Sequence, residues 1–124
     1  MAMNVGAEIS GVDLREPNPD AVMEIKQALI ERKVLVFRDQ DLTSHQYKIF
    51  MQSFGTPMKE DMIIDEGHPP EVGAIHIRPD ERQQINFWHM DHSFRDFPTP
   101  ILALYARLLP PVGGDTLFTS LEAA

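Results

Sequence analysis

The sequence predicts an α+β domain that is mainly β, because two helical segments come first and segments with strand character follow. Apolar residues at helical spacing are confined to the part of the chain before Gly55. After Gly55 the sequence is rich in loop residues and contains short apolar runs with β-branched and aromatic members. Helices followed by strands are typical of α+β domains with a largely antiparallel sheet. The expected strands cover residues 72–78, 86–91, 101–108 and 115–120.

The first helix is predicted over residues 19–32. Asn18 is a suitable N-cap, Pro19 suits the first helical position, and Asp20 suits the positive end of the helix dipole. Apolar side chains then recur on one face of this segment. The run VLVFR at 34–38 follows, and its continuous apolar character predicts a short strand that is buried on both faces.

The second helix is predicted over residues 44–54. Thr43 and Gln46 have the spacing of a capping box, in which each residue satisfies a free backbone N–H group of the other. Apolar and aromatic residues follow at helical spacing, and Gly55 stands where a C-terminal cap belongs. This segment therefore carries both a start signal and a stop signal.

Another capping-box pair lies near the end of the sequence. Thr119 and Glu122 have the spacing that begins a helix, yet Ala124 is the last residue, less than one turn later. We therefore expect residues 1–124 to form a single, incomplete domain, the front part of a longer fold.

Composition and charge exclude several classes of function. The sequence contains no cysteine, so a metal would need His, Asp, Glu or water as ligands. The net charge of −8 disfavours nucleic acid as a partner. No apolar run approaches the length of about 18 residues that a membrane span needs, and the N-terminus lacks the pattern of a signal peptide. We expect a cytoplasmic protein without a membrane partner.

The stretch NFWHMDHSFRDF at 86–97 carries the candidate chemistry. In a strand, His89 and Asp91 would project from the same face and could chelate a divalent ion. With a second histidine they would make the two-His-one-carboxylate set of non-haem Fe(II) oxygenases. The simpler alternative is a strand that happens to contain polar residues, because His-X-Asp also occurs by chance.

The neighbours of this pair modify the interpretation. Trp88 and Phe94 would enclose the pair with apolar surface and hold the rotamers of the ligands. His92 would point to the opposite face of a continuing strand, as a support or a surface residue. Thr116 follows a Pro-Pro-Val-Gly-Gly turn, and its hydroxyl could donate to a carboxylate, although a plain hairpin turn is the simpler interpretation.

Ordered blocks along the chain resemble the taurine and 2,4-dichlorophenoxyacetate dioxygenase family, the TauD/TfdA type of Fe(II)- and 2-oxoglutarate-dependent oxygenases. The blocks are VGAEISGVDL, VLVFRDQDLTSHQYKIFMQSFG, WHMDHSF and PPVGGDTLFTSLEAA. The resemblance implies a double-stranded β-helix, a cupin-like jelly-roll of about eight strands with flanking helices. It also implies that His89 and Asp91 are two of three iron ligands and that Thr116 helps to hold 2-oxoglutarate. Asn86 and Phe87, just upstream, are our candidates for substrate contacts.

The implied reaction hydroxylates a small anionic organic substrate and converts 2-oxoglutarate and O2 to succinate and CO2. In this family the third ligand, a histidine, and the arginine that binds 2-oxoglutarate come from the C-terminal half. Here no histidine follows His92, and the last basic residue is Arg107. Because two ligands hold iron weakly, we expect this N-terminal portion to be inactive alone.

Two other functions stay open at this point. A truncated, non-catalytic family member would act as an interaction or dimerisation module, and a simple metal binder would use His89, Asp91 and His92. An incomplete jelly-roll would also expose apolar side chains, which predicts self-association or a missing C-terminal portion that covers the open sheet. The side chains expected to be exposed are Phe87, Ile101, Leu104 and Leu117.

Overall fold

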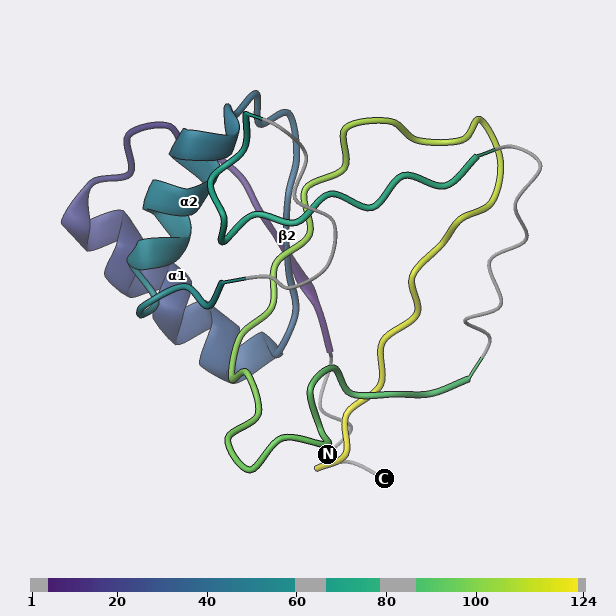
Figure 1. The fold of residues 1–124 in the computed structure, drawn as a ribbon. Helices are drawn as coiled ribbons and strands as arrows, with labels where there is room; N and C mark the ends of the chain where they lie inside the picture. The colour runs from purple at the N-terminus through teal and green to yellow at the C-terminus, as the bar shows by residue number, and fades with distance from the viewer. Residues whose placement is uncertain (1–4, 60–66, 79–86, 123–124) are drawn as a thin grey trace.

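Two helices and a pair of short strands form a layered unit at one side of the molecule, and the rest of the chain extends from it as long irregular segments (Figure 1). The computed structural model describes residues 5–59, 67–78 and 87–122. The elements follow the order β1 (Ala7–Ile9), α1 (Pro19–Arg32), β2 (Leu35–Phe37) and α2 (Ser44–Gln52). None of the helices in this described part is long and apolar enough to cross a membrane.

The bounds of α1 are those predicted from its N-terminal cap and its apolar face. The Asn18 side-chain oxygen accepts a hydrogen bond from the Ala21 N–H group at 2.8 Å, and Pro19 opens the helix. At the other end, Lys33 adopts a left-handed conformation with φ of 68°, and its N–H group donates to the Leu29 carbonyl at 2.8 Å. Both ends are therefore fixed by groups that satisfy the free backbone atoms of the helix.

The capping box of α2 is also confirmed, but the helix ends earlier than predicted. The Gln46 N–H group donates to Thr43 Oγ1 at 3.2 Å, and the Thr43 N–H group donates to Gln46 Oε1 at 2.9 Å. Regular helix stops at Gln52, two residues before the predicted end. The Ser53 and Phe54 N–H groups instead bond to carbonyls three residues back, so the last turn tightens.

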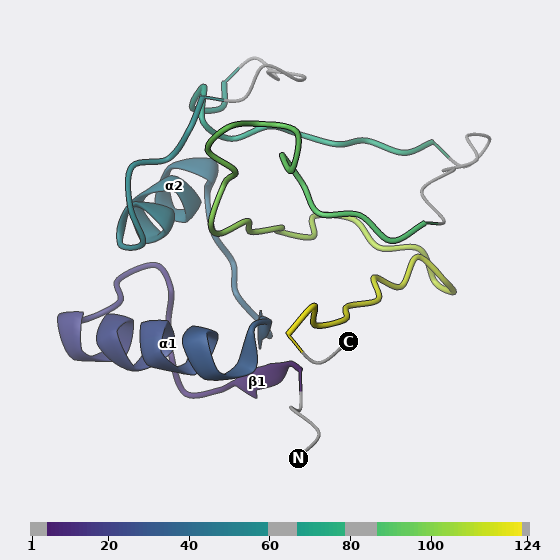
Figure 2. The same ribbon diagram turned by 90° about the horizontal axis from the view of Figure 1, so that it is seen from below.

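The strand pair is parallel, so the expectation of a largely antiparallel sheet is wrong for the described residues. β1 pairs with β2 in the register Ala7 with Leu35 and Ile9 with Phe37. Because α1 connects the two strands as a crossover, both run in the same direction, and α1 lies alongside them (Figure 2). Burial of β2 on both faces is also wrong, since Val36 is 40% exposed.

The later strands that the sequence predicts are not formed in the described residues. The segments 72–78, 87–91, 101–108 and 115–120 have no strand ladder there, because their backbones find no neighbouring strand. Residues 101–105 still show the two-residue period of a strand: Ile101, Ala103 and Tyr105 are partly buried, and Leu102 and Leu104 are exposed. The backbone direction of a strand is therefore kept in these residues, whereas the ladder is not formed.

The exposure of apolar side chains follows the prediction with one exception. Phe87, Leu104 and Leu117 are 66%, 70% and 74% exposed. Ile101 is instead partly buried, because the residues around it pack toward α2. The buried core is small and lies between the helices and β2, with the members Leu14, Ile25, Leu42 and Phe50.

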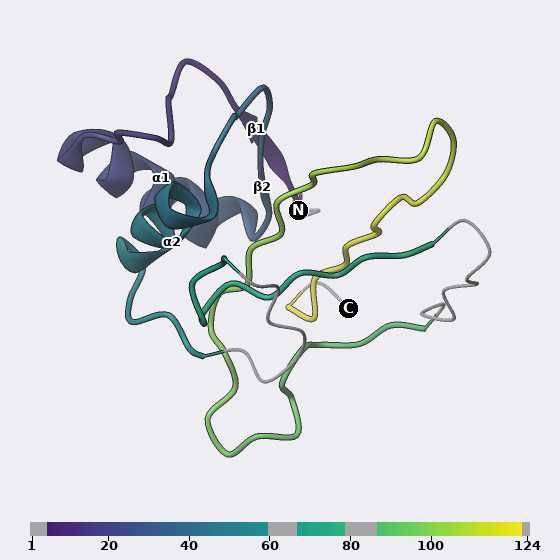
Figure 3. The same ribbon diagram turned by 45° about the horizontal axis from the view of Figure 1, so that its top comes forward.

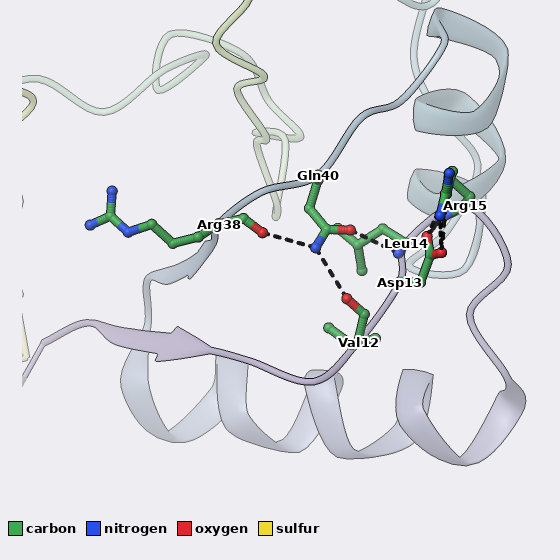
Figure 4. A network of polar contacts seen from close by, with 6 residues as sticks. All are labelled: Val12, Asp13, Leu14, Arg15, Arg38 and Gln40. Carbon is green, nitrogen blue, oxygen red and sulfur yellow. Dashed lines mark hydrogen bonds and ion pairs between the residues drawn. The ribbon is translucent and has the colours of Figure 1, made fainter.

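A single glutamine side chain continues the pairing beyond the ends of the two strands (Figure 4). The Gln40 amide nitrogen donates to the carbonyls of Val12 and Arg38, at 3.1 and 3.0 Å. Its amide oxygen accepts from the Leu14 N–H group at 2.9 Å. The Gln40 side-chain amide therefore pairs with backbone groups as a peptide group would, and it holds the segment after β1 against the segment after β2.

The second half of the chain is anchored to this layer through Tyr105. The Tyr105 hydroxyl accepts from the Leu42 N–H group at 3.0 Å and donates to the Gln40 carbonyl at 2.9 Å. Arg107 Nη1 donates to the Leu42 carbonyl at 3.0 Å. The Tyr47 hydroxyl, on α2, donates to the Ala103 carbonyl at 2.7 Å. Figure 3 shows this yellow-green segment leaving the layered unit and extending away from it.

We expect Tyr105→Phe to lower the free energy of unfolding by about 1–3 kcal/mol, because it leaves the Leu42 N–H and Gln40 carbonyl groups without their partner. Tyr47→Phe is the matched control, since it removes one donated hydrogen bond and should cost about 1 kcal/mol. Equilibrium urea unfolding measures both values. An effect of Tyr105→Phe no larger than that of Tyr47→Phe would contradict the anchoring role.

Asp13 provides a pH-dependent contribution beside the Gln40 network (Figure 4). Arg15 Nη2 lies 2.6 Å from Asp13 Oδ2. Hydrogen bonds from the Arg15 side chain, and then from its backbone, lower the Asp13 pKa from 3.8 to about 2. Because the folded pKa is the lower one, the pair favours the folded chain above pH 3.8, and this contribution is lost as the pH falls toward 2.

An NMR titration of the Asp13 carboxyl should therefore give a midpoint of about 2. Arg15→Gln should return the midpoint toward 3.8, because the charged hydrogen-bond donor is gone. A wild-type midpoint already at the ordinary value would show that the pair does not persist in solution.

Candidate metal centre

The two candidate metal ligands lie in an irregular segment that ends in a tight turn, not in a strand. The Ser93 N–H group bonds to the Met90 carbonyl at 3.3 Å, and the Arg95 N–H group bonds to the His92 carbonyl at 3.0 Å. His92 has φ of 56°, in the left-handed region. A strand cannot pass through this conformation, so the expectation of a continuing strand at 86–91 and beyond is wrong for its described part.

His89 and Asp91 are nevertheless brought together. His89 Nε2 lies 3.5 Å from Asp91 Oδ1. His89 Nδ1 lies 3.2 Å from the Phe87 carbonyl oxygen, which can only accept, so Nδ1 carries a hydrogen. When the imidazole is protonated, the two atoms form an ion pair. When the ring is neutral with its hydrogen on Nδ1, the lone pair of Nε2 faces the carboxylate, and a cation between the two atoms would be bound by both.

The donor set fits a divalent ion. Two ligand atoms that each lie about 2.1 Å from one ion are about 3 to 3.5 Å apart. The observed separation of 3.5 Å is close to that spacing. The hydrogen bond from Nδ1 to a backbone carbonyl is the support that metal-binding histidines usually have. The side chains of His89 and Asp91 are 46% and 49% exposed, so an ion can reach both.

The apolar enclosure expected from Trp88 and Phe94 is wrong. Trp88 is 67% exposed and Phe94 is 84% exposed, because the chain turns after Asp91 and directs these rings to solvent. Phe87 is the aromatic residue that contacts a candidate ligand. Its ring lies edge-on to the His89 imidazole with the centroids 5.7 Å apart.

The remaining histidine of the stretch does not join the pair. His92 is partly buried, and its Nδ1 lies 2.6 Å from Thr99 Oγ1. Within residues 5–59, 67–78 and 87–122, no group of three or more His, Asp or Glu side chains is placed to hold a metal ion. This finding argues against a plain metal site made by His89, Asp91 and His92.

The predicted 2-oxoglutarate contact, Thr116, is exposed, and in the described part of the chain no hydrogen bond joins it to His89 or Asp91. Gly113 and Gly114 before it have φ of 79° and 78°, as the predicted glycine turn requires. Asn86 lies outside the described residues, so its predicted role stays a prediction.

Thr99 is the contact residue that the sequence did not indicate. It stands between Pro98 and Pro100, in a segment that predicts only a loop. It lies seven residues after His92, which is a helical spacing, but the prolines on either side of it and the turn at 90–93 exclude a helix between the two residues. Only the turn of the backbone brings the hydroxyl to the imidazole.

Comparisons with known proteins agree with the blocks found in the sequence. The family model described as "Taurine catabolism dioxygenase TauD, TfdA family" matches residues 1–124. An alkylsulfatase of Acinetobacter baylyi is 35% identical, over 97% of this chain and 38% of the relative. The alpha-ketoglutarate-dependent 2,4-dichlorophenoxyacetate dioxygenase of Cupriavidus pinatubonensis is 31% identical, over 95% of this chain and 47% of the relative.

The (S)-phenoxypropionate/alpha-ketoglutarate-dioxygenase of Sphingobium herbicidovorans is 28% identical, over 96% of this chain and 43% of the relative. The chain thus spans less than half the length of these curated relatives. Among solved structures, AAD-2 in complex with Mn(II) and N-oxalylglycine is 37% identical with a TM-score of 0.42, over 49% of this chain and 22% of that chain.

Proposed function

The chain belongs to the taurine catabolism dioxygenase TauD, TfdA family, and on this premise we propose that it is the N-terminal portion of an Fe(II)- and 2-oxoglutarate-dependent dioxygenase. The observation that carries the proposal is the facing of His89 Nε2 and Asp91 Oδ1 at 3.5 Å. The proposed reaction hydroxylates a small anionic organic substrate and converts 2-oxoglutarate and O2 to succinate and CO2. Relatives named for alkyl sulfates and aryloxy acids support an anionic substrate.

The chain's own residues have distinct roles in this proposal. His89 Nε2 and the Asp91 carboxylate would hold the iron, which supplies the oxidative chemistry when it is bound. The bond from His89 Nδ1 to the Phe87 carbonyl fixes the orientation of the imidazole. Phe87 lies beside that ring and would contact the substrate. Asn86, its neighbour, is the second proposed substrate contact.

Binding of 2-oxoglutarate needs groups beyond the pair. Thr116 would donate its hydroxyl to a carboxylate of 2-oxoglutarate, as the family resemblance implies. We propose that the third iron ligand and the arginine that pairs with 2-oxoglutarate come from a further portion of a longer chain. The much greater length of the relatives supports this, and residues 1–124 alone would then be inactive.

A second candidate function, a module for self-association, is favoured by the exposed apolar side chains of the extended segments. Leu104 and Leu117 are 70% and 74% exposed, and neither has a neighbouring strand in the described residues. Apolar surface of this kind marks an interface or a surface that another part of the chain covers. Either cover, a second copy or a further chain portion, would also protect the open backbone edges.

We expect His89→Ala and Asp91→Ala each to raise the Fe(II) dissociation constant by at least about tenfold, because loss of a supporting group alone costs that much. Anaerobic equilibrium dialysis measures the constants. His45→Ala is the matched control, since His45 is exposed on α2 and is no candidate ligand. Unchanged iron binding in His89→Ala would rule out the proposed site.

For the second candidate, sedimentation velocity of the 124-residue chain should show association that increases with concentration. Replacing both Leu104 and Leu117 by Gln should raise the dissociation constant at least about tenfold, because each buried leucine contributes about 1.5–3 kcal/mol. Ile49→Gln is the control, since Ile49 is also exposed but lies on α2. A chain that stays monomeric at every concentration would argue against self-association.

A further inference from the structure

His92 differs from the residues around it in burial and in partners. Residues 87–91 and Ser93 are exposed, whereas His92 is partly buried. Its Nδ1 lies 2.6 Å from Thr99 Oγ1, and the Thr99 hydroxyl donates to Met58 Sδ at 3.4 Å. The imidazole is therefore tied, through one hydroxyl, to the segment that leaves α2.

The bond between His92 and Thr99 is the stronger of these two contacts. A threonine hydroxyl can either donate to a ring nitrogen or accept from it, whereas a thioether sulfur is only a weak acceptor. In either direction, the bond at 2.6 Å holds the imidazole against Thr99 and fixes the orientation of its plane.

The backbone of His92 explains why such an anchor is needed. His92 is the third residue of the Met90–Ser93 turn, and its φ of 56° is the left-handed value that such turns require there. A residue with a side chain is about 1–2 kcal/mol less stable in this conformation than in the right-handed one. Hydrogen bonds of the side chain can compensate for that cost.

The candidate ligand Asp91 is the second residue of the same turn. The Ser93–Met90 hydrogen bond closes the turn only for a narrow range of the backbone dihedrals of Asp91 and His92, so it restricts the direction in which the Asp91 side chain leaves the backbone. If the turn opened, φ of Asp91 would no longer be restricted, and the 3.5 Å approach of Asp91 Oδ1 to His89 Nε2 would no longer be held.

We propose that His92 is a positioning residue, whose hydrogen bond to Thr99 holds the turn that aims the Asp91 carboxylate at His89. The role of this turn in iron binding rests on the proposed function, whereas the geometry of the turn is independent of that function. His92 itself is no ligand in this proposal.

Thr99→Val and Thr99→Ser test the proposal in the full chain, with Mn(II) as the probe. Valine keeps the shape of threonine but removes the hydroxyl, so we expect the Mn(II) dissociation constant to rise about tenfold. Serine keeps the hydroxyl and should restore binding close to that of the wild type. Isothermal titration calorimetry measures the constants, and His89→Ala gives the level without a site.

A second measurement does not depend on metal. Nitrogen-15 NMR of the His92 ring should give the same Nδ1 shift in the wild type and in Thr99→Ser, and a different shift in Thr99→Val, because the hydrogen bond at Nδ1 is then lost. The amide shifts of Met90 and Asp91 should move in Thr99→Val only, because the turn relaxes.

Mn(II) affinity and the NMR signals together distinguish a failure of the proposed function from a failure of the positioning role of His92. If the wild type binds Mn(II) no better than His89→Ala, the proposed function fails, and the ring and amide signals still decide on the role of His92. Wild-type amide shifts in Thr99→Val would overturn the positioning role, and so would a Thr99→Ser variant that behaves like Thr99→Val. If the wild type binds Mn(II) more tightly than His89→Ala does, unchanged Mn(II) affinity in Thr99→Val would also overturn the positioning role.

Discussion

The Tyr105 hydroxyl, inserted between the Gln40 carbonyl and the Leu42 N–H group, is the interaction on which the arrangement of the second half of the chain depends. The segments after residue 67 have no strand ladder in the described residues, so side chains must place them. Tyr105 and Arg107 bond to backbone groups at the start of α2, and Tyr47 bonds back to Ala103. A small α/β layer thereby becomes the support of a much longer extended segment.

The candidate centre is built by local chain geometry on this support. His89 and Asp91 face each other in an irregular segment whose end is closed by the Met90–Ser93 turn, and Asp91 is a residue of that turn. A site made this way is exposed and incomplete, and it offers two ligands at a suitable spacing. The pair is a candidate iron site because the chain belongs to the TauD, TfdA family, since His-X-Asp alone is a weak signal of metal binding.

The sequence predicted well what depends on neighbours along the chain. The start of α1 followed from Asn18 and Pro19, and the start of α2 followed from the Thr43 and Gln46 pair, because capping bonds are local. What depends on distant residues was missed or wrong. A strand needs a partner to form its ladder, so the apolar run at 101–108 predicted a strand that finds no ladder, and it did not predict that Ile101 is partly buried. The contact of Thr99 with His92 depends on the backbone turn between them, which the types of the residues do not indicate.

The central claim is that this chain carries two of the three protein ligands of an iron site that works with 2-oxoglutarate. The most direct measurement is the visible absorption spectrum of the full natural chain under anaerobic conditions, as Fe(II) and 2-oxoglutarate are added separately and together. The account predicts a weak charge-transfer band that needs both additions and is absent in His89→Ala. Iron or zinc binding without such a band would contradict it.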